Sequence, residues 1–167
     1  MAGERFGRFW AAATISSFGT AVTAVAMPVL VVRDLEASAF AVGVVNAAQF
    51  LPYAVLGLVA GAYADRWRRQ RVLVWSSLGR AFALGAIPVL WACGTLGVWT
   101  LVALLLAFGA FSVFGFAATQ SLLPRLVPRS RLVAANARLD QGDAAAQTFG
   151  PALGGGLVGL LGAPLAI

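Results

Sequence analysis

Five long stretches of the sequence are almost free of charged residues, and they constrain the fold more than any other feature. They cover residues 9–32, 39–64, 72–94, 98–119 and 144–161. A helix of about 20 apolar residues crosses the hydrocarbon core of a bilayer, which is roughly 30 Å thick. Such segments must be helices, because lipid offers the backbone no hydrogen-bonding partner. The pattern predicts an all-α membrane protein with five transmembrane helices, followed from residue 162 by a turn and the start of a sixth.

The overall composition supports a membrane environment. Hydrophobic residues make up 60% of the 167 residues, and only 11% are charged, whereas about 25% are charged in an average soluble protein. The net charge is +6, and every basic residue is an arginine. These arginines lie in short connectors between the apolar stretches and form no basic face, so we expect no nucleic-acid partner. The expected surroundings are a lipid bilayer.

The connectors carry their arginines on alternate sides. Arg33 is the sole arginine between the first two stretches, and the connector between the third and fourth has none. The N-terminus and the other two connectors hold ten: Arg5, Arg8, Arg66, Arg68, Arg69, Arg71, Arg125, Arg129, Arg131 and Arg138. Because cytoplasmic loops of membrane proteins are rich in arginine and lysine, this bias predicts a multi-pass protein of the inner (plasma) membrane with a cytoplasmic N-terminus.

The sequence offers no set of residues typical of an enzyme. It has one cysteine, Cys93, and no histidine, so an internal disulfide and a Cys/His metal site are both excluded. It also lacks a phosphate-binding glycine loop and a Ser/His/Asp set. We therefore expect no enzymatic activity, no catalytic residue, no metal and no cofactor. We interpret Cys93 as a packing residue.

The connector between the fourth and fifth stretches is long and contains two prolines. Pro124 and Pro128 are expected to break it, and Ser130 is a candidate cap for the helix that follows. Residues 131–142 have the pattern of an amphipathic helix at the inner membrane interface, leading into the fifth span. Asp140 and Asp143 then fall at the end of that span, and no carboxylate is expected deep within any span.

Polar residues inside the apolar stretches are candidates for lining an aqueous path, because they are costly in lipid. Ser16, Thr20 and Thr23 share one helical face. They could equally assist helix packing, and both interpretations stay open. Asn46 and Gln49 lie three residues apart in the second stretch. Packing explains an amide pair less well, so these two favour a cavity.

Arg80 and Pro52 are unusual at their positions within spans. Arg80 lies about 12–13 Å into the third stretch at 1.5 Å per residue. Its side chain either extends to the inner interface or points inward to a carboxylate or to helix-end carbonyls. Pro52 removes a backbone donor one turn after Gln49 and is expected to bend its helix.

The fifth stretch contains two rows of small residues. Gly155 and Gly159 form one row, and Ala146, Gly150 and Gly154 form the other, with Pro151 between them. Rows of this kind let two helices approach closely. The contact serves either stability alone or, in a transporter, a surface on which helices slide or seal.

The charged turn after the second stretch carries a recognisable motif. It reads "GAYADRWRRQR" and contains Gly61, Asp65, Arg66, Arg69 and Arg71. It resembles the signature G-x-x-x-D-[RK]-x-G-[RK]-[RK] of the major facilitator superfamily (MFS). Arg68 replaces the usual glycine of that signature, and Gln70 replaces a basic residue.

Two further segments strengthen the resemblance. "GPALGG", with Gly150, Pro151, Gly154 and Gly155, is similar to the span-five motif of the family's exporters, although Ala146 replaces an upstream glycine. "LLPRLVPRSRLVAAN" resembles the corresponding loop of the bacterial macrolide and siderophore exporters. The resemblance implies the N-terminal half of a secondary transporter that exports small amphipathic compounds by alternating access. It also implies that Asp65, Arg66 and Arg69 hold an inner gate against the second half.

The length suggests a fragment, since family members have around 400 residues and two six-helix halves. We expect a missing C-terminal half, on the same or a separate chain, and no transport by the isolated chain. No span-four arginine of the proton-coupled exporters is present, so these residues give proton coupling no support. Two alternatives remain: a small membrane accessory or structural subunit, and the permease part of an ATP-driven pump. The two glycine motifs favour the facilitator over both.

Overall fold

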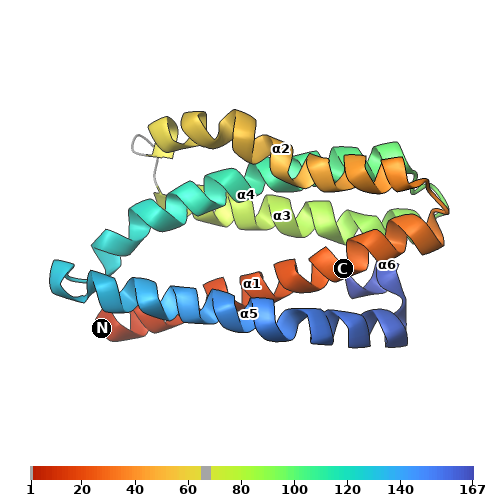
Figure 1. Ribbon diagram of the computed structural model, residues 1–167. Coiled ribbons are helices and arrows are strands. Elements are labelled where there is room, and N and C mark those ends of the chain that lie inside the picture. Colours follow the sequence, from red (N-terminus) through yellow and green to blue (C-terminus); the bar gives the residue numbers. More distant parts are fainter. Residues whose placement is uncertain (1, 65–68) are drawn as a thin grey trace. The chain divides into compact units, whose positions relative to one another are not determined.

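The structure is a computed structural model that describes residues 2–64 and 69–167, and within these ranges it is helical almost throughout, with no strand (Figure 1). Five helices in this part are long and apolar enough to cross a membrane. They are α1 (Ala2–Val29), α2 (Ala39–Ala64), α3 (Arg69–Ala92), α4 (Val98–Leu126) and α5 (Leu132–Leu161). A π-helical turn η1 (Leu30–Asp34), a 3₁₀ turn η2 (Arg129–Arg131) and a short α6 (Ala163–Ala166) complete them. The prediction of an all-α membrane fold is confirmed.

The chain divides into two compact units. The first comprises α1 together with residues 123–167, and the second comprises residues 30–122. Each unit has its own internal helix contacts, and these contacts position the candidate functional residues.

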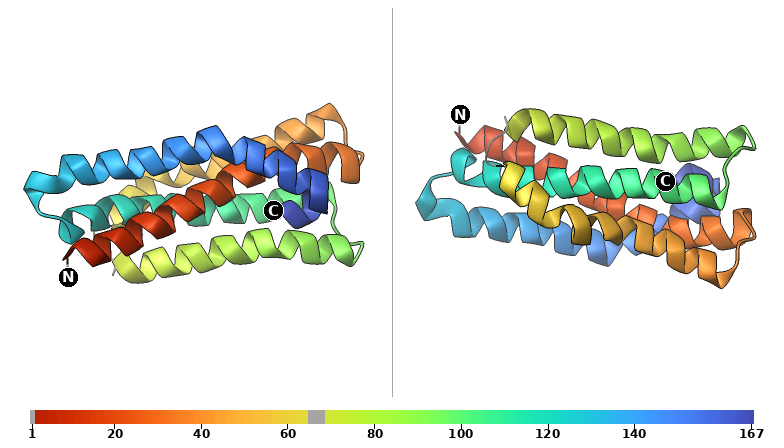
Figure 2. Two further views of the ribbon diagram at one scale, coloured as in Figure 1. Left: turned by 90° about the horizontal axis from the view of Figure 1, so that it is seen from below. Right: turned by 90° about the horizontal axis from the view of Figure 1, so that it is seen from above.

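In the first unit, α1 and α5 lie side by side along most of their length, as both views of Figure 2 show. The face of α5 that meets α1 is made of small buried residues at intervals of four: Gly142, Ala146, Gly150 and Gly154. A Cβ at Gly150 would collide with the side chain of Ala21, and one at Gly154 would lie 3.2 Å from the Cα of Val22. Because Gly150 and Gly154 have no side chain, the backbones of α1 and α5 can approach closely.

The two ends of this unit are closed by apolar contacts. At one end Phe6 of α1 is buried with Leu123 and Ala135, and Phe9 packs against this cluster. At the other end α5 stops at Gly162, whose φ of 85° is accessible mainly to glycine. The chain then turns back, and α6 packs against both α1 and α5.

In the second unit, α4 contacts both α2 and α3. A Cβ at Gly79 of α3 would lie 2.6 Å from the ring of Phe111, and one at Gly109 of α4 would lie 2.8 Å from the backbone oxygen of Gln49. The side chains of Leu101 and Leu105 on α4 are fully buried. Two glycines, one on α3 and one on α4, thus permit close helix contacts in this unit as well.

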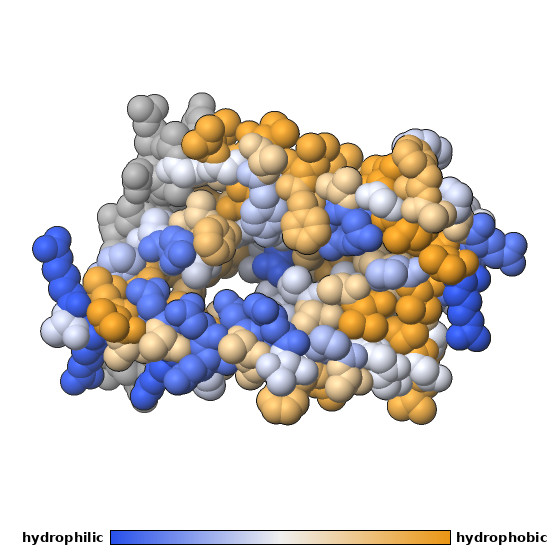
Figure 3. Space-filling view, in the orientation of Figure 1, coloured by the Kyte–Doolittle hydropathy of each residue, from blue (hydrophilic) through white to orange (hydrophobic). Residues whose placement is uncertain are grey.

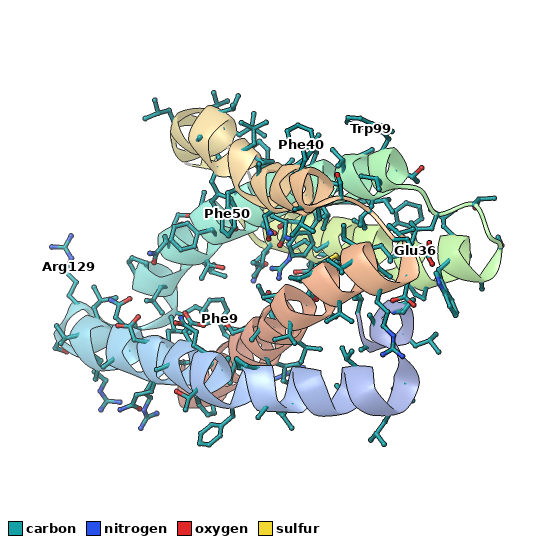
Figure 4. All side chains as sticks on the ribbon, turned by 45° about the vertical axis from the view of Figure 1, so that its right-hand side comes forward. Phe9, Glu36, Phe40, Phe50, Trp99 and Arg129 are labelled. Carbon is teal, nitrogen blue, oxygen red and sulfur yellow. The ribbon has the colours of Figure 1, made fainter. Side chains whose placement is uncertain are left out.

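Much of the outward surface of the helices is apolar. Phe40 and Phe50 project from α2, and Trp99 projects from the start of α4 (Figure 4), with exposed fractions of 77%, 69% and 76%. Figure 3 shows apolar side chains across α2 and polar side chains over the first half of α5. A soluble protein rarely exposes so large an apolar surface, and lipid chains are the solvent that suits it.

The connector between α4 and α5 differs from two expectations. Pro124 does not break α4, which continues to Leu126; neighbouring groups can satisfy the backbone bond lost at a proline in a membrane helix. Ser130 does not cap α5, because Ser130 itself lies in the turn η2 and α5 begins at Leu132 without a side-chain cap. As a result, α5 is one continuous helix that includes both the expected amphipathic segment and the fifth span.

Candidate functional site

The three hydroxyl residues predicted to line a path on α1 differ in burial and in their bonding. Thr20 donates to the carbonyl of Ser16 at 3.0 Å, and Thr23 donates to the carbonyl of Gly19 at 2.9 Å. Thr23 is buried, Ser16 is half-buried and Thr20 is exposed. Bonds of this kind to the preceding turn use up the hydroxyl proton. The two threonines can therefore offer another group only their oxygen lone pairs.

A different serine on α1 makes the polar contact with α5. The hydroxyl of Ser17 donates to the carboxylate of Asp143, and its oxygen also lies 3.1 Å from the carbonyl of Ala13. The sequence placed Asp143 at the end of a span. The structure places it within the continuous helix α5, which begins at Leu132, and beside an uncharged stretch of α1. The position of Asp143 at the end of the fifth span stays a prediction.

Two more α1 residues with polar side chains lie at the same helix contact. The indole Nε1 of Trp10 donates to the carbonyl of Arg138 at 2.8 Å. One turn further along α1, Thr14 packs against Gly142, and its hydroxyl oxygen is buried with no hydrogen-bond partner among the described residues. Polar side chains therefore follow the first half of the α1–α5 contact, and apolar side chains follow the second.

Sequence reasoning missed this polar row because it selected residues on each helix separately. Trp10, Thr14 and Ser17 repeat at intervals of four and three, which places them on one face of α1. Arg138, Gly142 and Ala146 repeat at intervals of four on α5. The sequence contains both of these regular spacings, one on each helix. Only the structure shows that the two helix faces contact each other.

In the second unit, Arg80 lies against an aromatic ring of α4. Its guanidinium carbon is 5.3 Å from the centre of the Phe108 ring, a distance typical of a cation–π interaction. Arg80 is half-buried. The neighbouring Ser76 is buried and bonds to the carbonyl of Val72 at 2.5 Å, and Gly115 of α4 packs against it. The side chain of Arg80 is thus oriented toward α4.

The amide pair on α2 lies next to the closest contact between α2 and α4. Pro52 is buried against Gly109, and Gln49 contributes its backbone oxygen to the same contact. Asn46 is exposed, Gln49 is half-buried, and neither side-chain amide forms a hydrogen bond with another described residue. Both amides are available to bond a group outside the described chain.

The charged loop motif is described only in part. Asp65 and Arg66 lie outside the described residues, and so does the side chain of Arg69, the first residue of α3. Gly61 lies in the last turn of α2, where a Cβ would meet no described atom within 4 Å. Arg71 is exposed in the first turn of α3. The gating role of this motif remains a prediction.

The span-five motif divides between two faces of α5. Gly150 and Gly154 face α1, whereas Cβ atoms at Gly155 and Gly159 would meet no atom of the described residues within 4 Å. Pro151 is exposed. The two small-residue rows expected from the sequence therefore have different surroundings, and only the first packs against a helix of the described chain. Within that chain no group of three or more His, Cys, Asp or Glu could hold a metal ion.

The arrangement of five apolar helices with glycine-lined contacts agrees with a comparison to protein families. The family model of the Major Facilitator Superfamily matches residues 9–167, nearly the whole chain. The chain belongs to the Major Facilitator Superfamily. The resemblance found in its charged loop and in its fifth span is thereby confirmed at the level of the family.

Three similar proteins illustrate the match, and two of them have names that include a function. The "Multidrug efflux pump Tap" of Mycolicibacterium fortuitum is 32% identical over 157 residues, which cover 90% of this chain and 38% of Tap. An uncharacterized MFS-type transporter of Bacillus subtilis, YfiS, is 32% identical and matches 89% of this chain and 34% of its own length. "Macrolide efflux protein A" of Streptococcus pyogenes is 26% identical and matches 77% of this chain and 31% of its own length.

The MFS chain described here spans about a third of the length of these curated relatives. No solved structure gives a significant match. The family match and the five apolar helices show a multi-pass membrane protein of this superfamily. Because the chain covers only part of its relatives, the activity of a whole transporter is left to the proposal below.

Proposed function

We propose that this chain is part of a secondary active transporter that exports small amphipathic compounds, such as drugs or siderophore-like molecules, by alternating access. The family match over residues 9–167 carries the proposal. Two of the relatives are named as multidrug or macrolide efflux proteins. MFS transporters bind substrate near the bilayer midplane, between two halves that rock about the site.

Several residues in the spans of each unit suit the lining of such a path. Asn46 and Gln49 have amides with no partner in the described chain, and Arg80 holds its charge against the ring of Phe108. Ser16, Thr20 and Thr23 present oxygen atoms along α1. We assign these six residues to the substrate path. Within the second unit, Asn46, Gln49 and Arg80 with the ring of Phe108 provide both polar groups and aromatic surface, which suits an amphipathic ligand.

The loop motif has a separate role in the proposal. Asp65, Arg66, Arg69 and Arg71, with Gly61 before them, close the cytoplasmic side of the path by charge contacts with the second half of the transporter. The N-terminus and this loop lie in the cytoplasm, because the arginine-rich connectors favour that side. The partners are therefore the lipid bilayer, the substrate and a C-terminal half on the same or a separate chain.

Drug susceptibility tests the proposal. The gene that carries this sequence is expressed in a bacterial strain that lacks its own efflux pumps, and growth inhibition by erythromycin, tetracycline and ethidium is measured. We expect resistance to at least one compound and lower cellular ethidium. Asp65→Asn should abolish the effect at equal expression, whereas Asp34→Asn, in another connector, should not. Unchanged susceptibility to the whole panel, with the protein present in the membrane, would contradict drug export.

A further inference from the structure

Four exposed arginines gather at one end of the first unit. The helices α1 and α5 lie side by side and both start at this end, where Phe6 is buried with Leu123 and Ala135. The arginines come from α1, from the turn η2 and from the start of α5: Arg8, Arg129, Arg131 and Arg138. Arg129 projects outward from the end of the unit (Figure 4). The distribution of arginines along the chain assigns this end to the cytoplasmic side of the membrane.

The contact between α1 and α5 places two of these arginines at the level of the lipid headgroups. The charge-free stretch of α1 begins at Phe9, directly after Arg8. The indole of Trp10 donates to the carbonyl of Arg138 at 2.8 Å, so Arg138 lies level with the start of that stretch. Tryptophan is enriched where the hydrocarbon meets the headgroups. Arg8 and Arg138 are therefore both expected at the boundary between the apolar and the polar part of a bilayer.

The other two arginines lie further from the hydrocarbon. Arg131 precedes Arg138 by seven residues, which corresponds to about 10 Å along a helix. A charge at this distance from a charged surface still interacts with it, because the Debye length is about 10 Å at an ionic strength of roughly 0.1 M. Arg131 and the nearby Arg129 are thus close enough to an acidic membrane surface to be attracted by it.

The arginines are attached to a well-packed apolar contact. Leu132 and Leu139 pack against the cluster of Phe6, Leu123 and Ala135, and each of these two leucines directly follows an arginine. No ion pair joins any of the four arginines to another residue whose side chain the structure describes. Their backbone is therefore held in place before a ligand arrives, and a preorganised site loses less entropy on binding.

The chemistry of this end favours acidic phospholipids. A guanidinium forms charge-assisted hydrogen bonds with phosphate oxygens, and arginines beside a membrane attract lipids that have a net negative charge. Zwitterionic phospholipids have similar acyl chains but no net charge. Asp140 and Asp143 follow on α5 and oppose part of the attraction. Four arginines against two aspartates nevertheless leave a net charge of +2 on the described side chains of this end.

We propose that the arginines at this end of the first unit bind the headgroups of acidic phospholipids, and that the chain thereby selects acidic over zwitterionic lipids. The interaction is independent of the proposed export function, since neither a substrate nor a second half of the transporter takes part in it.

Fluorescence quenching by brominated lipids tests this assignment, with Trp10 as the reporter. The other four tryptophans, Trp67, Trp75, Trp91 and Trp99, are replaced by phenylalanine. The chain is reconstituted in vesicles of phosphatidylcholine and phosphatidylglycerol, with either lipid brominated on the upper part of its acyl chains. Bromine quenches only nearby tryptophan, so the ratio of quenching reports which lipid lies at this end. We expect phosphatidylglycerol to associate about fivefold more strongly, the factor that corresponds to about 1 kcal/mol.

Three variants and one competitor separate the possible causes of a preference. Joint replacement of the four arginines by glutamine should bring the ratio close to one, with the helix content by circular dichroism unchanged, whereas joint replacement by lysine should retain the preference. Arg33→Gln removes an arginine from the connector between α1 and α2 and should have no effect. Millimolar inorganic phosphate should not reduce the quenching by phosphatidylglycerol.

Several results would overturn the inference. They are equal association of the two lipids with the unaltered chain, an undiminished preference in the glutamine variant, and an equal loss of preference in Arg33→Gln. Displacement by inorganic phosphate would identify a site for the free anion instead of a lipid. Lipid selection without drug resistance would leave this inference intact and count against the proposed function alone.

Discussion

At the scale of single residues, identical amino acids have different roles according to the face on which they lie. Gly150 and Gly155 belong to the same glycine-rich segment of α5. A Cβ would collide with Ala21 at Gly150, but at Gly155 it would meet no described atom within 4 Å. Only the first glycine is required for the contact with α1, and this difference can be tested directly.

Gly150→Ala should destabilise the α1–α5 pair, because the added methyl group must push the helices apart. Overpacking of this kind costs about 1–3 kcal/mol. The free energy of unfolding in mixed micelles of mild detergent and sodium dodecyl sulfate, followed by tryptophan fluorescence, measures it. Gly155→Ala is the matched control and should be neutral or slightly stabilising, since alanine favours helix by about 1 kcal/mol. Equal effects of both substitutions would contradict the packing described here.

Arg80 and Phe108 should be energetically coupled, because the guanidinium lies over the ring. A double-mutant cycle with Arg80→Met and Phe108→Leu removes the charge and the ring separately and together. We expect a coupling energy of about 0.5–2 kcal/mol in the same unfolding assay. A value near zero would show that Arg80 instead extends to the membrane interface.

At the scale of elements, the contact between α5 and α1 depends on the regular spacing of small residues along α5. Its small residues meet α1 at every fourth position, from Gly142 to Gly154. A row with a period of four drifts only slowly around a helix of 3.6 residues per turn. One face of α5 therefore stays in contact with α1 over several turns.

Insertion of one alanine after Gln147 should disrupt this register. It rotates the rest of α5 by about 100° and moves Gly150 and Gly154 away from α1. The free energy of unfolding should fall by several kcal/mol, the size expected when a core contact is lost. The same insertion after Leu160 leaves both glycines in place and should have little effect. Similar results for the two insertions would mean that α5 does not depend on this row.

At the scale of the whole molecule, the distribution of arginines predicts which connectors face the cytoplasm. The free and exposed Cys93 provides a native reporter, since it is the first residue after α3 and lies in the uncharged connector to α4. Its exposure differs from the packing role expected from the sequence.

A membrane-impermeant maleimide should label Cys93 in intact cells, because the predicted topology places this connector outside the cytoplasm. As a control, Cys93→Ser combined with Ser130→Cys moves the thiol to the arginine-rich connector. That variant should be labelled only after the membrane is permeabilised. The reverse pattern, measured by a mass shift on gels, would invert the proposed orientation.

The apolar stretches by themselves determined the fold class and the number of long helices. Charge-free runs of about 20 residues leave a chain few alternatives to transmembrane helices. The loop and span-five motifs identified the superfamily because their glycines, aspartate and arginines occur together and in order. These signals are local, so they can be read without knowing which helices touch.

Only the tertiary structure decided which face of each helix meets which neighbour. It paired Ser17 with Asp143, and it assigned Gly150 and Gly154, but not Gly155, to the contact with α1. In lipid, both the packed and the exposed faces of a helix are apolar, so composition does not distinguish them. Close contact depends on the fit of two surfaces, and that fit exists only once helices distant in sequence lie side by side.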